Sequence, residues 1–292
     1  MTAKRLTGKE VTEKLIEDLS SRCEALKKKG TVPCLAIVRA GENASDLAYE
    51  RGALSRAEKV GVDIKKYVAP QDASTEEILA VIDEINKDDS IHGILVFRPM
   101  PSQIDDEKVR NAIDPAKDMD GVTDGSLAGV FSGRDLGYPP CTASACMEIL
   151  DFYRIDPKGK KAVVIGRSLV IGRPAAMMLM NKNATVTICH TRTDREDLVK
   201  YCRNADILVA AAGVADNVTS ELMSPGQIIL DVGINVNEDG KMCGDVRTCD
   251  AERIAEAFTP VPGGVGGVTS AILMKHVIEA AEKKQEKVIR KR

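Results

Sequence analysis

Short apolar runs alternate along the chain with longer charged segments whose apolar residues recur at helical spacing. In the first hundred residues this pattern predicts strands over 34–39, 62–68 and 91–97, and helices over 7–29, 45–60 and 74–87. The last of these helices opens with Ser74 and carries Glu77 three residues later, which is a capping box. Repeated alternation of this kind is typical of an α/β fold, with a mostly parallel sheet covered by helices on both faces.

A second series of strands and helices follows a stretch over 118–140 that is rich in glycine, aspartate and proline. We interpret that stretch as a loop-bearing junction between two domains, because it lacks sustained periodicity. The second series predicts strands over 161–165, 184–189, 206–210 and 227–232, and a last helix over 270–287 with a basic end. A length of 292 residues agrees with two domains.

The composition excludes several classes of protein. Hydrophobic residues make up 43% and charged residues 29%, which is typical of a globular chain and not of a disordered one. The formal net charge is −3 and aromatic residues are only 3%, so we expect no nucleic-acid partner. The longest apolar run, 207–215, is too short to cross a bilayer, so we expect no membrane partner. The first residues carry no apolar signal segment, and we therefore expect a cytoplasmic protein.

Cysteine and histidine give no pattern typical of a metal centre. The eight cysteines form no C-x-x-C pair and the three histidines form no H-x-x-x-H pair. We therefore expect no metal site, and we expect the cysteines to be small buried thiols.

The segment from Val163 to Pro174 has the features of a phosphate-binding turn between a strand and a helix. An apolar strand runs into Gly166, Arg167 and Ser168 follow, and Gly172 precedes the start of a helix. Such a turn directs free backbone N–H groups and the positive end of the helix at a phosphate. It resembles the Rossmann turn with serine at the second glycine and a spacing one residue longer, although an ordinary turn is the alternative. No glycine completes G-x-S-x-G, so a hydrolase nucleophile elbow is a poor interpretation.

The end of the next strand bears on the choice of dinucleotide. A site for NAD usually has a carboxylate there, whereas this chain has Thr191 and Arg192 after His190. Together with Arg167, these residues suit a 2′-phosphate, so we predict NADP, with NAD possible. Two exposed surface arginines are the alternative. Asp194 and Glu196 lie just beyond and are expected to cap the following helix.

A glycine-rich loop over 259–269 is a third candidate site. Its closely spaced glycines let the backbone approach a flat ligand, although such loops are often simple turns.

Taken together, these motifs resemble the bifunctional methylenetetrahydrofolate dehydrogenase/cyclohydrolase family over nearly the whole chain. The resemblance rests on eight ordered stretches, namely 93–96, 117–121, 140–142, 163–174, 184–190, 231–235, 244–246 and 259–266. It implies two α/β domains around a cleft in a homodimer. The first would be a folate-substrate domain of residues 1–140 with 271–292, and the second a Rossmann-like NADP-binding domain of residues 141–270.

The resemblance also implies a reaction and its residues. In the family, hydride passes from 5,10-methylenetetrahydrofolate to NADP⁺, and water then opens the methenyl product to 10-formyltetrahydrofolate, a one-carbon donor for purine biosynthesis. Tyr49 and Asp120 match the catalytic-site tyrosine and the carboxylate that anchors the pterin. The predicted substrate-binding residues are Tyr49, Phe97, Asp120, Pro262, Gly263 and Gly264. The predicted cofactor-binding residues are Gly166, Arg167, Ser168, Thr191, Arg192 and Ile234.

The folate half departs from the family pattern. The lysine assigned to cyclohydrolase chemistry stands four residues after the tyrosine in the family, and this position is Ala53 here. Arg51 and Arg56 are near, but arginine scarcely deprotonates and cannot replace a tunable lysine. The family's pocket glutamine is Phe97, and its Pro-Met in the glycine loop is Gly267-Val268.

Four hypotheses follow from these residues. The chain is a dehydrogenase with weak or lost cyclohydrolase activity, a bifunctional enzyme with another group in place of the lysine, a paralogue with another substrate, or a silent dinucleotide-binding protein. We favour the first, because Tyr49, Asp120 and the dinucleotide turn are all retained.

Overall fold

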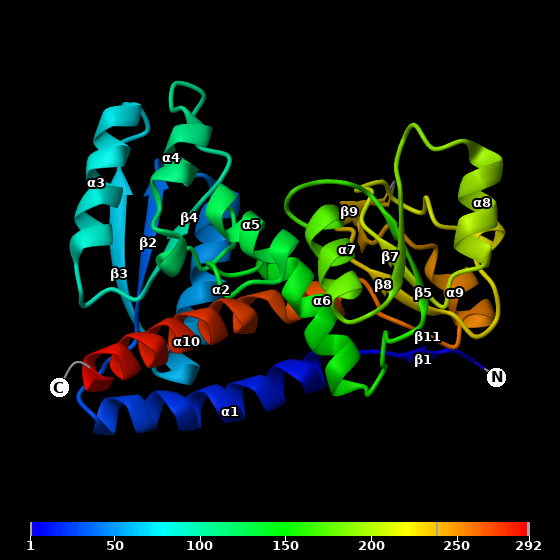
Figure 1. The fold of residues 1–292 in the computed structure, drawn as a ribbon. Coiled ribbons are helices and arrows are strands. Elements are labelled where there is room, and N and C mark those ends of the chain that lie inside the picture. Colours follow the sequence, from blue (N-terminus) through cyan, green and yellow to red (C-terminus); the bar gives the residue numbers. More distant parts are fainter. Residues whose placement is uncertain (1, 238, 291–292) are drawn as a thin grey trace. The chain divides into compact units, whose positions relative to one another are not determined.

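The computed structural model describes residues 2–237 and 239–290, which form two compact units (Figure 1). The first unit comprises residues 13–141 and 270–290, and the second comprises residues 2–12 and 142–269. The sequence analysis placed residues 2–12 in the first domain. Their contacts are with the second unit, because Lys4 and Arg5 pair with Ala257 and Phe258 in a parallel ladder.

The first unit is built on a parallel three-stranded sheet in the order β3-β2-β4. Its strands are β2 (Cys34–Ala40), β3 (Asp63–Ala69) and β4 (Gly93–Val96), and its helices are α2 (Ala44–Val60), α3 (Thr75–Lys87), α4 (Asp106–Ala112), α5 (Asp124–Ser132) and most of α1 (Gly8–Lys28) and α10 (Thr269–Arg290). A short 3₁₀ turn spans Pro115–Lys117. The capping box predicted at Ser74 and Glu77 is confirmed, and both of its hydrogen bonds are present.

A core on one face of this sheet joins it to α3 and α4. Buried residues from β2 and β4 pack there against Ile78, Ile82 and Ile85 of α3 and Val109 of α4. The isoleucines recur at the helical spacing that predicted α3, so one apolar stripe both defines the helix and attaches it to the sheet.

The junction predicted over 118–140 contains a helix that the sequence analysis missed. Thr123 caps α5 through its side chain, which accepts a hydrogen bond from the Ser126 N–H. The glycine in this helix is required by close packing, because a Cβ at Gly129 would lie 2.0 Å from the Leu136 carbonyl oxygen. Glycine therefore marks a tight contact here and not only a loop.

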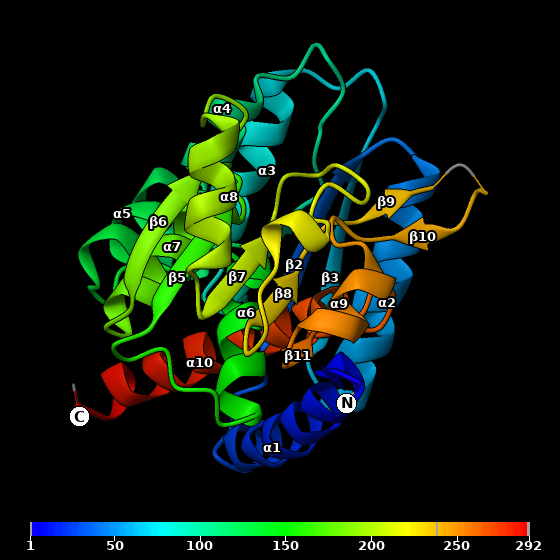
Figure 2. The ribbon, with the colours of Figure 1, turned by 90° about the vertical axis from the view of Figure 1, so that its right-hand side faces the viewer.

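The second unit contains a six-stranded parallel sheet in the order β1-β11-β8-β7-β5-β6. Its strands are β1 (Lys4–Arg5), β5 (Lys161–Ile165), β6 (Thr185–Cys189), β7 (Ile207–Ala210), β8 (Ile228–Asp231) and β11 (Ala257–Phe258), and a separate hairpin joins β9 (Asn235–Val236) to β10 (Met242–Cys243). Its helices are α6 (Cys141–Phe152, whose first residue belongs to the first unit), α7 (Gly172–Asn181), α8 (Arg195–Arg203) and α9 (Thr248–Ile254), with 3₁₀ turns at Ser220–Leu222 and Val265–Gly267. Figure 2 shows β6, β5, β7 and β8 side by side, with α8 and α9 in front.

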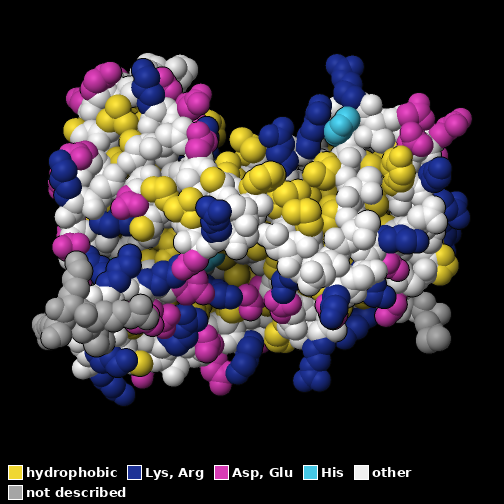
Figure 3. All heavy atoms as spheres, in the orientation of Figure 1, with side chains coloured by type: hydrophobic (Ala, Val, Ile, Leu, Met, Phe, Trp, Pro, Cys, Tyr) yellow, Lys and Arg dark blue, Asp and Glu magenta, His cyan; other side chains and the backbone are white. Residues whose placement is uncertain are grey.

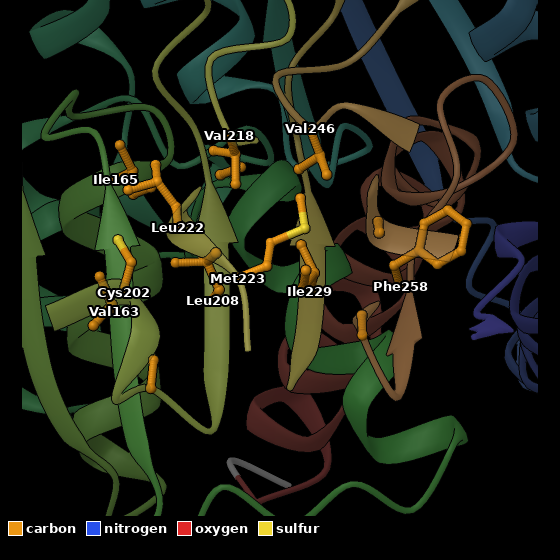
Figure 4. Packing of buried hydrophobic residues seen from close by; sticks show 14 of the residues in the cluster. Val163, Ile165, Cys202, Leu208, Val218, Leu222, Met223, Ile229, Val246 and Phe258 are labelled. Atoms are coloured by element: carbon orange, nitrogen blue, oxygen red, sulfur yellow. The ribbon is translucent and has the colours of Figure 1, made fainter. Parts of the chain in front are cut away.

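One row of side chains crosses four strands of this sheet in register. Val163, Leu208, Ile229 and Phe258 pair in turn from β5 to β11 and enter one buried cluster (Figure 4). Residues of α8 and α9 cover that cluster, whereas α7 packs against β5 and β6. The sheet therefore fixes where each strand ends, and with it the loops at its carboxyl edge.

Candidate active site

The turn after β5 is closed so tightly that two of its positions require glycine. Gly166 has a φ of +126°, and a Cβ there would lie 2.1 Å from the carbonyl oxygen of Ala211. A Cβ at Gly172 would lie 2.3 Å from the carbonyl oxygen of Gly166. These contacts bring the backbone of the turn against the first turn of α7, which is the cradle that a phosphate needs.

The start of α7 lacks a side-chain cap, although the Arg173 N–H is already bonded within the preceding turn. No side chain caps its first N–H groups, since the capping position is Ile171. The hydroxyl of Ser168 accepts a hydrogen bond from the Ile171 N–H at 3.2 Å, and the Ser168 carbonyl accepts one from the Arg173 N–H at 3.0 Å. Arg167 and Ser168 are exposed. The residues present therefore fit a pyrophosphate at this helix end.

The turn after β6 presents its polar side chains to solvent. The His190 N–H donates to the Thr193 hydroxyl at 2.9 Å, and the Arg192 N–H donates to His190 Nδ1 at 3.1 Å. Thr191 and Arg192 are exposed on this closed turn. The Asp194 carboxylate caps α8 by accepting from the Glu196 N–H, as predicted, and Glu196 lies in the first turn of that helix.

Ile234 and the glycine loop lie together in the second unit. The Ile234 side chain is 68% exposed, and its Cδ1 would lie 3.7 Å from a Cβ at Gly266. Gly263 has a φ of +99°, and its carbonyl accepts a hydrogen bond from the Gly8 N–H at 2.8 Å. The predicted substrate residues 262–264 are thus held against the start of α1.

In the first unit, two aromatic side chains of the predicted folate site are in contact. The ring centroids of Tyr49 and Phe97 are 5.6 Å apart and the rings are nearly perpendicular. Tyr49 is 42% exposed, whereas Phe97 is buried. Desolvation of the hydroxyl, and then the charge of Asp120, raise the pKa of Tyr49. Its hydroxyl therefore stays protonated near neutral pH.

Asp120 follows a backbone segment that is fixed by side chains far away in the sequence. His276 Nδ1 donates to the Met119 carbonyl oxygen at 2.8 Å, and the Cys141 thiol donates to the same oxygen at 3.3 Å. Asp118 fixes the backbone that follows Asp120, because its carboxylate accepts hydrogen bonds from the Val122 and Thr123 N–H groups. Neither His276 nor Cys141 was predicted as a site residue. The only signal for Cys141 was its position in a stretch that carries the family resemblance.

The environment of Asp120 makes it a carboxyl group that titrates near neutrality. Burial and the charge of Asp118 raise the pKa of Asp120 to about 6, against the opposing effects of Cys141 and Arg98. Arg98 itself pairs with Asp106, with Nε 2.6 Å from Oδ1. A guanidinium whose field reaches Asp120 was not predicted as a site feature.

Ala53 is buried one helical turn after Tyr49. The nearby Arg56 directs its Nε to the Ser270 hydroxyl at 3.3 Å, and burial lowers its pKa. Arg51 is exposed. The position of the expected lysine therefore holds a methyl group.

Comparison with known proteins agrees with this arrangement. Residues 6–120 match the tetrahydrofolate dehydrogenase/cyclohydrolase catalytic domain, and residues 140–285 match the NAD(P)-binding domain of the same family. The bifunctional protein FolD of Carboxydothermus hydrogenoformans is 49% identical over 282 residues, which are 96% of this chain and 98% of the relative. The chain belongs to the tetrahydrofolate dehydrogenase/cyclohydrolase family.

Solved structures of the family show the same fold. The bifunctional FolD enzyme of Campylobacter jejuni superimposes with a TM-score of 0.93 at 37% identity, covering 96% of this chain and 99% of that one. The Trypanosoma brucei FolD enzyme, solved with NADP and an inhibitor, gives a TM-score of 0.89 at 30% identity, covering 97% and 98%. The predicted family and α/β fold class are confirmed, and so is a nicotinamide dinucleotide as the class of cofactor.

The family match leaves the roles of single residues as predictions. Tyr49, Ala53, Phe97 and Asp120 lie within the matched catalytic domain, and the turn at Gly166 lies within the matched dinucleotide domain. Of the cysteines, six are buried as predicted, Cys243 is half-buried and Cys249 is exposed. Over residues 2–237 and 239–290, no helix is long and apolar enough to cross a membrane, and no three His, Cys, Asp or Glu side chains form a group suited to a metal.

Proposed function

We propose that this family member oxidises 5,10-methylenetetrahydrofolate to 5,10-methenyltetrahydrofolate with NADP⁺, and that its cyclohydrolase activity is weak or lost. The observation that carries the proposal is the buried methyl group of Ala53, one turn after Tyr49. Homodimer formation and a link to purine biosynthesis stay predictions from the family resemblance, and a cytoplasmic location stays a prediction from the sequence.

The dehydrogenase half of the proposal is supported by the turn after β5. NADP⁺ supplies the hydride acceptor when bound, and the protein orients it. The glycine turn and the positive end of α7, which has no side-chain cap, suit the pyrophosphate, and Arg167, Thr191 and Arg192 suit the 2′-phosphate of the adenosine ribose. Placing the bridge carbon of the folate beside the acceptor is then the main requirement for this step.

The substrate half rests on Tyr49 and Asp120. An ionised Asp120 accepts hydrogen bonds from pterin N–H groups, and the exposed Tyr49 ring offers a face for the folate to pack on. The buried Phe97 ring packs against Tyr49 in a nearly perpendicular contact.

Loss of the hydrolytic step is supported by the side chains that α2 places beside and after Tyr49. Water must be activated and a proton must reach a folate nitrogen before the methenyl ring opens. Ala53 has no titratable group, the Tyr49 hydroxyl is protonated at neutral pH as in an ordinary tyrosine and its raised pKa makes it a weaker acid still, and the Arg56 guanidinium donates to the Ser270 hydroxyl.

A second candidate function is the full bifunctional activity with Asp120 in the place of the lysine. The pKa of about 6 favours this alternative, because such a carboxyl group can exchange a proton near neutral pH. Asp120 would then bind the pterin and handle the proton in one turnover.

Two assays separate these functions. Reduction of NADP⁺ with methylenetetrahydrofolate tests the dehydrogenase, and its absence would point to another substrate or to a silent dinucleotide-binding protein. Decay of added methenyltetrahydrofolate with and without protein tests the cyclohydrolase. We expect reduction of NADP⁺ and decay at close to the uncatalysed rate. Rapid protein-dependent decay would establish the bifunctional alternative, and a fall in kcat of Asp120→Asn at saturating methenyltetrahydrofolate, beyond its rise in KM, would assign the proton transfer to Asp120.

A further inference from the structure

A buried carboxylate in the second unit gathers the loops at the carboxyl ends of two neighbouring strands. Asp245 is 0% exposed. Its Oδ2 accepts hydrogen bonds from the N–H groups of Ala212 at 2.6 Å and Gly213 at 2.9 Å. Its Oδ1 accepts from the Val214 N–H at 3.0 Å and from Asn235 Nδ2 at 2.9 Å. One side chain therefore satisfies three consecutive N–H groups after β7 and a side chain after β8.

This carboxylate is itself held firmly. The Asp231 carboxylate accepts hydrogen bonds from the Gly233, Asp245 and Val246 N–H groups, each at 3.0 Å. A Cβ at Gly233 would lie 2.1 Å from Asp245 Oδ1, and one at Gly244 would lie 1.8 Å from Asp231 Oδ2. Glycine is therefore required at positions 233 and 244, because the buried carboxylates leave no room for a Cβ there.

The same loop also touches the phosphate-binding turn. Ala211 precedes the three N–H groups that Asp245 gathers, and its carbonyl oxygen is the atom that a Cβ at Gly166 would meet. On the other side, Asn235 is the neighbour of the exposed Ile234, a predicted cofactor contact. Asp245 therefore lies between two segments to which the proposed function assigns the dinucleotide.

The strand order shows which half of a dinucleotide would lie over these loops. β5 has β6 on one side and β7 on the other, so the order reverses at β5. In such sheets a dinucleotide lies across the reversal, with its pyrophosphate at the first turn. Its adenosine half then extends toward the end of β6, and its nicotinamide half extends over the ends of β7 and β8.

We infer that Asp245 is a positioning residue for the nicotinamide half of the dinucleotide, acting through the loop 212–214 and Asn235. The three N–H groups of this loop resemble an anion-binding nest, but the protein's own carboxylate occupies it. The loop is thereby fixed in one conformation without taking a phosphate. The inference rests on the proposed function, since it concerns the placement of NADP⁺.

The test compares two ligands in Asp245→Asn by calorimetric titration. Asparagine keeps the size but offers one acceptor oxygen, so part of the loop is released. We expect the Kd of NADP⁺ to rise by about tenfold or more. Adenosine 2′,5′-bisphosphate, which occupies only the adenosine half, should bind within about twofold of wild type. A wild-type protein that binds neither ligand would contradict the proposed function itself.

Two further variants separate positioning from stability. Asp250→Asn is the matched control, because Asp250 is also buried and accepts a hydrogen bond from the Ser220 N–H in the same unit. It should lower the Tm and leave both affinities unchanged. Asn235→Ala removes one of the four donors to Asp245. It should raise the Kd of NADP⁺ by about threefold and leave that of adenosine 2′,5′-bisphosphate unchanged. The inference would be overturned if Asp245→Asn lost affinity for NADP⁺ and for adenosine 2′,5′-bisphosphate to the same extent. Unchanged affinity for NADP⁺ in Asn235→Ala would overturn it as well.

Discussion

At the scale of single residues, the folate half depends on which side chains can exchange a proton. Ala53 cannot exchange a proton, and Tyr49 keeps its proton at neutral pH. The pKa of Asp120, about 6, lets this carboxyl group exchange a proton near neutral pH. Three neighbouring positions in the first unit therefore have different chemical capacities, and each can be tested separately.

Restoring a lysine should restore hydrolysis in part. General acid–base assistance is typically worth about 10²–10⁴-fold, so Ala53→Lys with Phe97→Gln should accelerate methenyltetrahydrofolate decay measurably. Ala53→Lys alone should give less, because the buried Phe97 ring occupies the position of the family's glutamine. Ser55→Lys adds the same charge at an exposed position of the same helix and should change nothing. Equal gains from Ser55→Lys would contradict the assignment of position 53.

The pKa of Asp120 predicts an acid limit on substrate binding. The carboxylate accepts pterin N–H groups only when it is ionised, so affinity is present above a pH of about 6 and is lost as the pH falls below it. The KM for methylenetetrahydrofolate should rise by up to about tenfold per pH unit below this point. Asp120→Asn should bind weakly at every pH, with a flat profile. A wild-type KM that is constant down to pH 5 would exclude this role.

The arginine after Gly166 should determine the preference for NADP⁺. Loss of one charge-assisted contact costs about 1.5–3 kcal/mol, which is on the order of tenfold or more in affinity. Arg167→Ala should therefore raise the KM for NADP⁺ far more than that for NAD⁺. Arg203→Ala, at the exposed end of α8, is the control and should affect neither. Wild-type preference for NAD⁺ would refute the assignment.

At the scale of elements, local pattern was sufficient for most strands and long helices. Apolar runs that become buried strands, such as 34–39 and 161–165, carry their own signal. The helix α5 carries no such signal. Its glycines are there because neighbouring residues pack closely against them, and the sequence pattern does not reveal those neighbours. The same limit applied to the site. The turn at Gly166 is continuous in sequence, whereas His276 reaches Met119 across 157 residues and Asp245 reaches Ala212 across 33.

The helix α10 should make the first unit sensitive to acid. Burial lowers the pKa of His276, and of His92 after α3, to about 4. Each folded-state pKa is below the unfolded value of about 6.5, so stability is full above pH 6.5 and falls as the pH approaches 4. Protonation of His276 should lower the free energy of unfolding by on the order of 2–3 kcal/mol. Melting curves across this range should show a declining Tm, and His276→Gln should flatten the decline.

At the scale of the whole molecule, the chain passes between the two units three times, after residues 12, 141 and 269. Charged side chains of both signs are intermingled on the face in Figure 3, in keeping with a net charge of −3. The first unit contains the predicted folate residues 49, 97 and 120, and the second contains the predicted dinucleotide residues and the glycine loop. Dinucleotide binding therefore tests substitutions in the second unit alone, whereas folate binding tests residues 49, 97 and 120 of the first unit together with the predicted substrate residues 262–264 of the second.

The pairing of β1 with β11 has a consequence for synthesis on the ribosome. The partner of Lys4, Ala257, emerges more than 250 residues after it. At ordinary rates of translation this interval is on the order of 10–50 s. During that time the first strand has no neighbour in its sheet, while the three strands of the first unit, complete by Val96, can already pair. Proteolysis of the nascent chain should therefore find the strands β2, β3 and β4 protected while β1 is still open to cleavage, and the first unit is completed only when α10 emerges after β11.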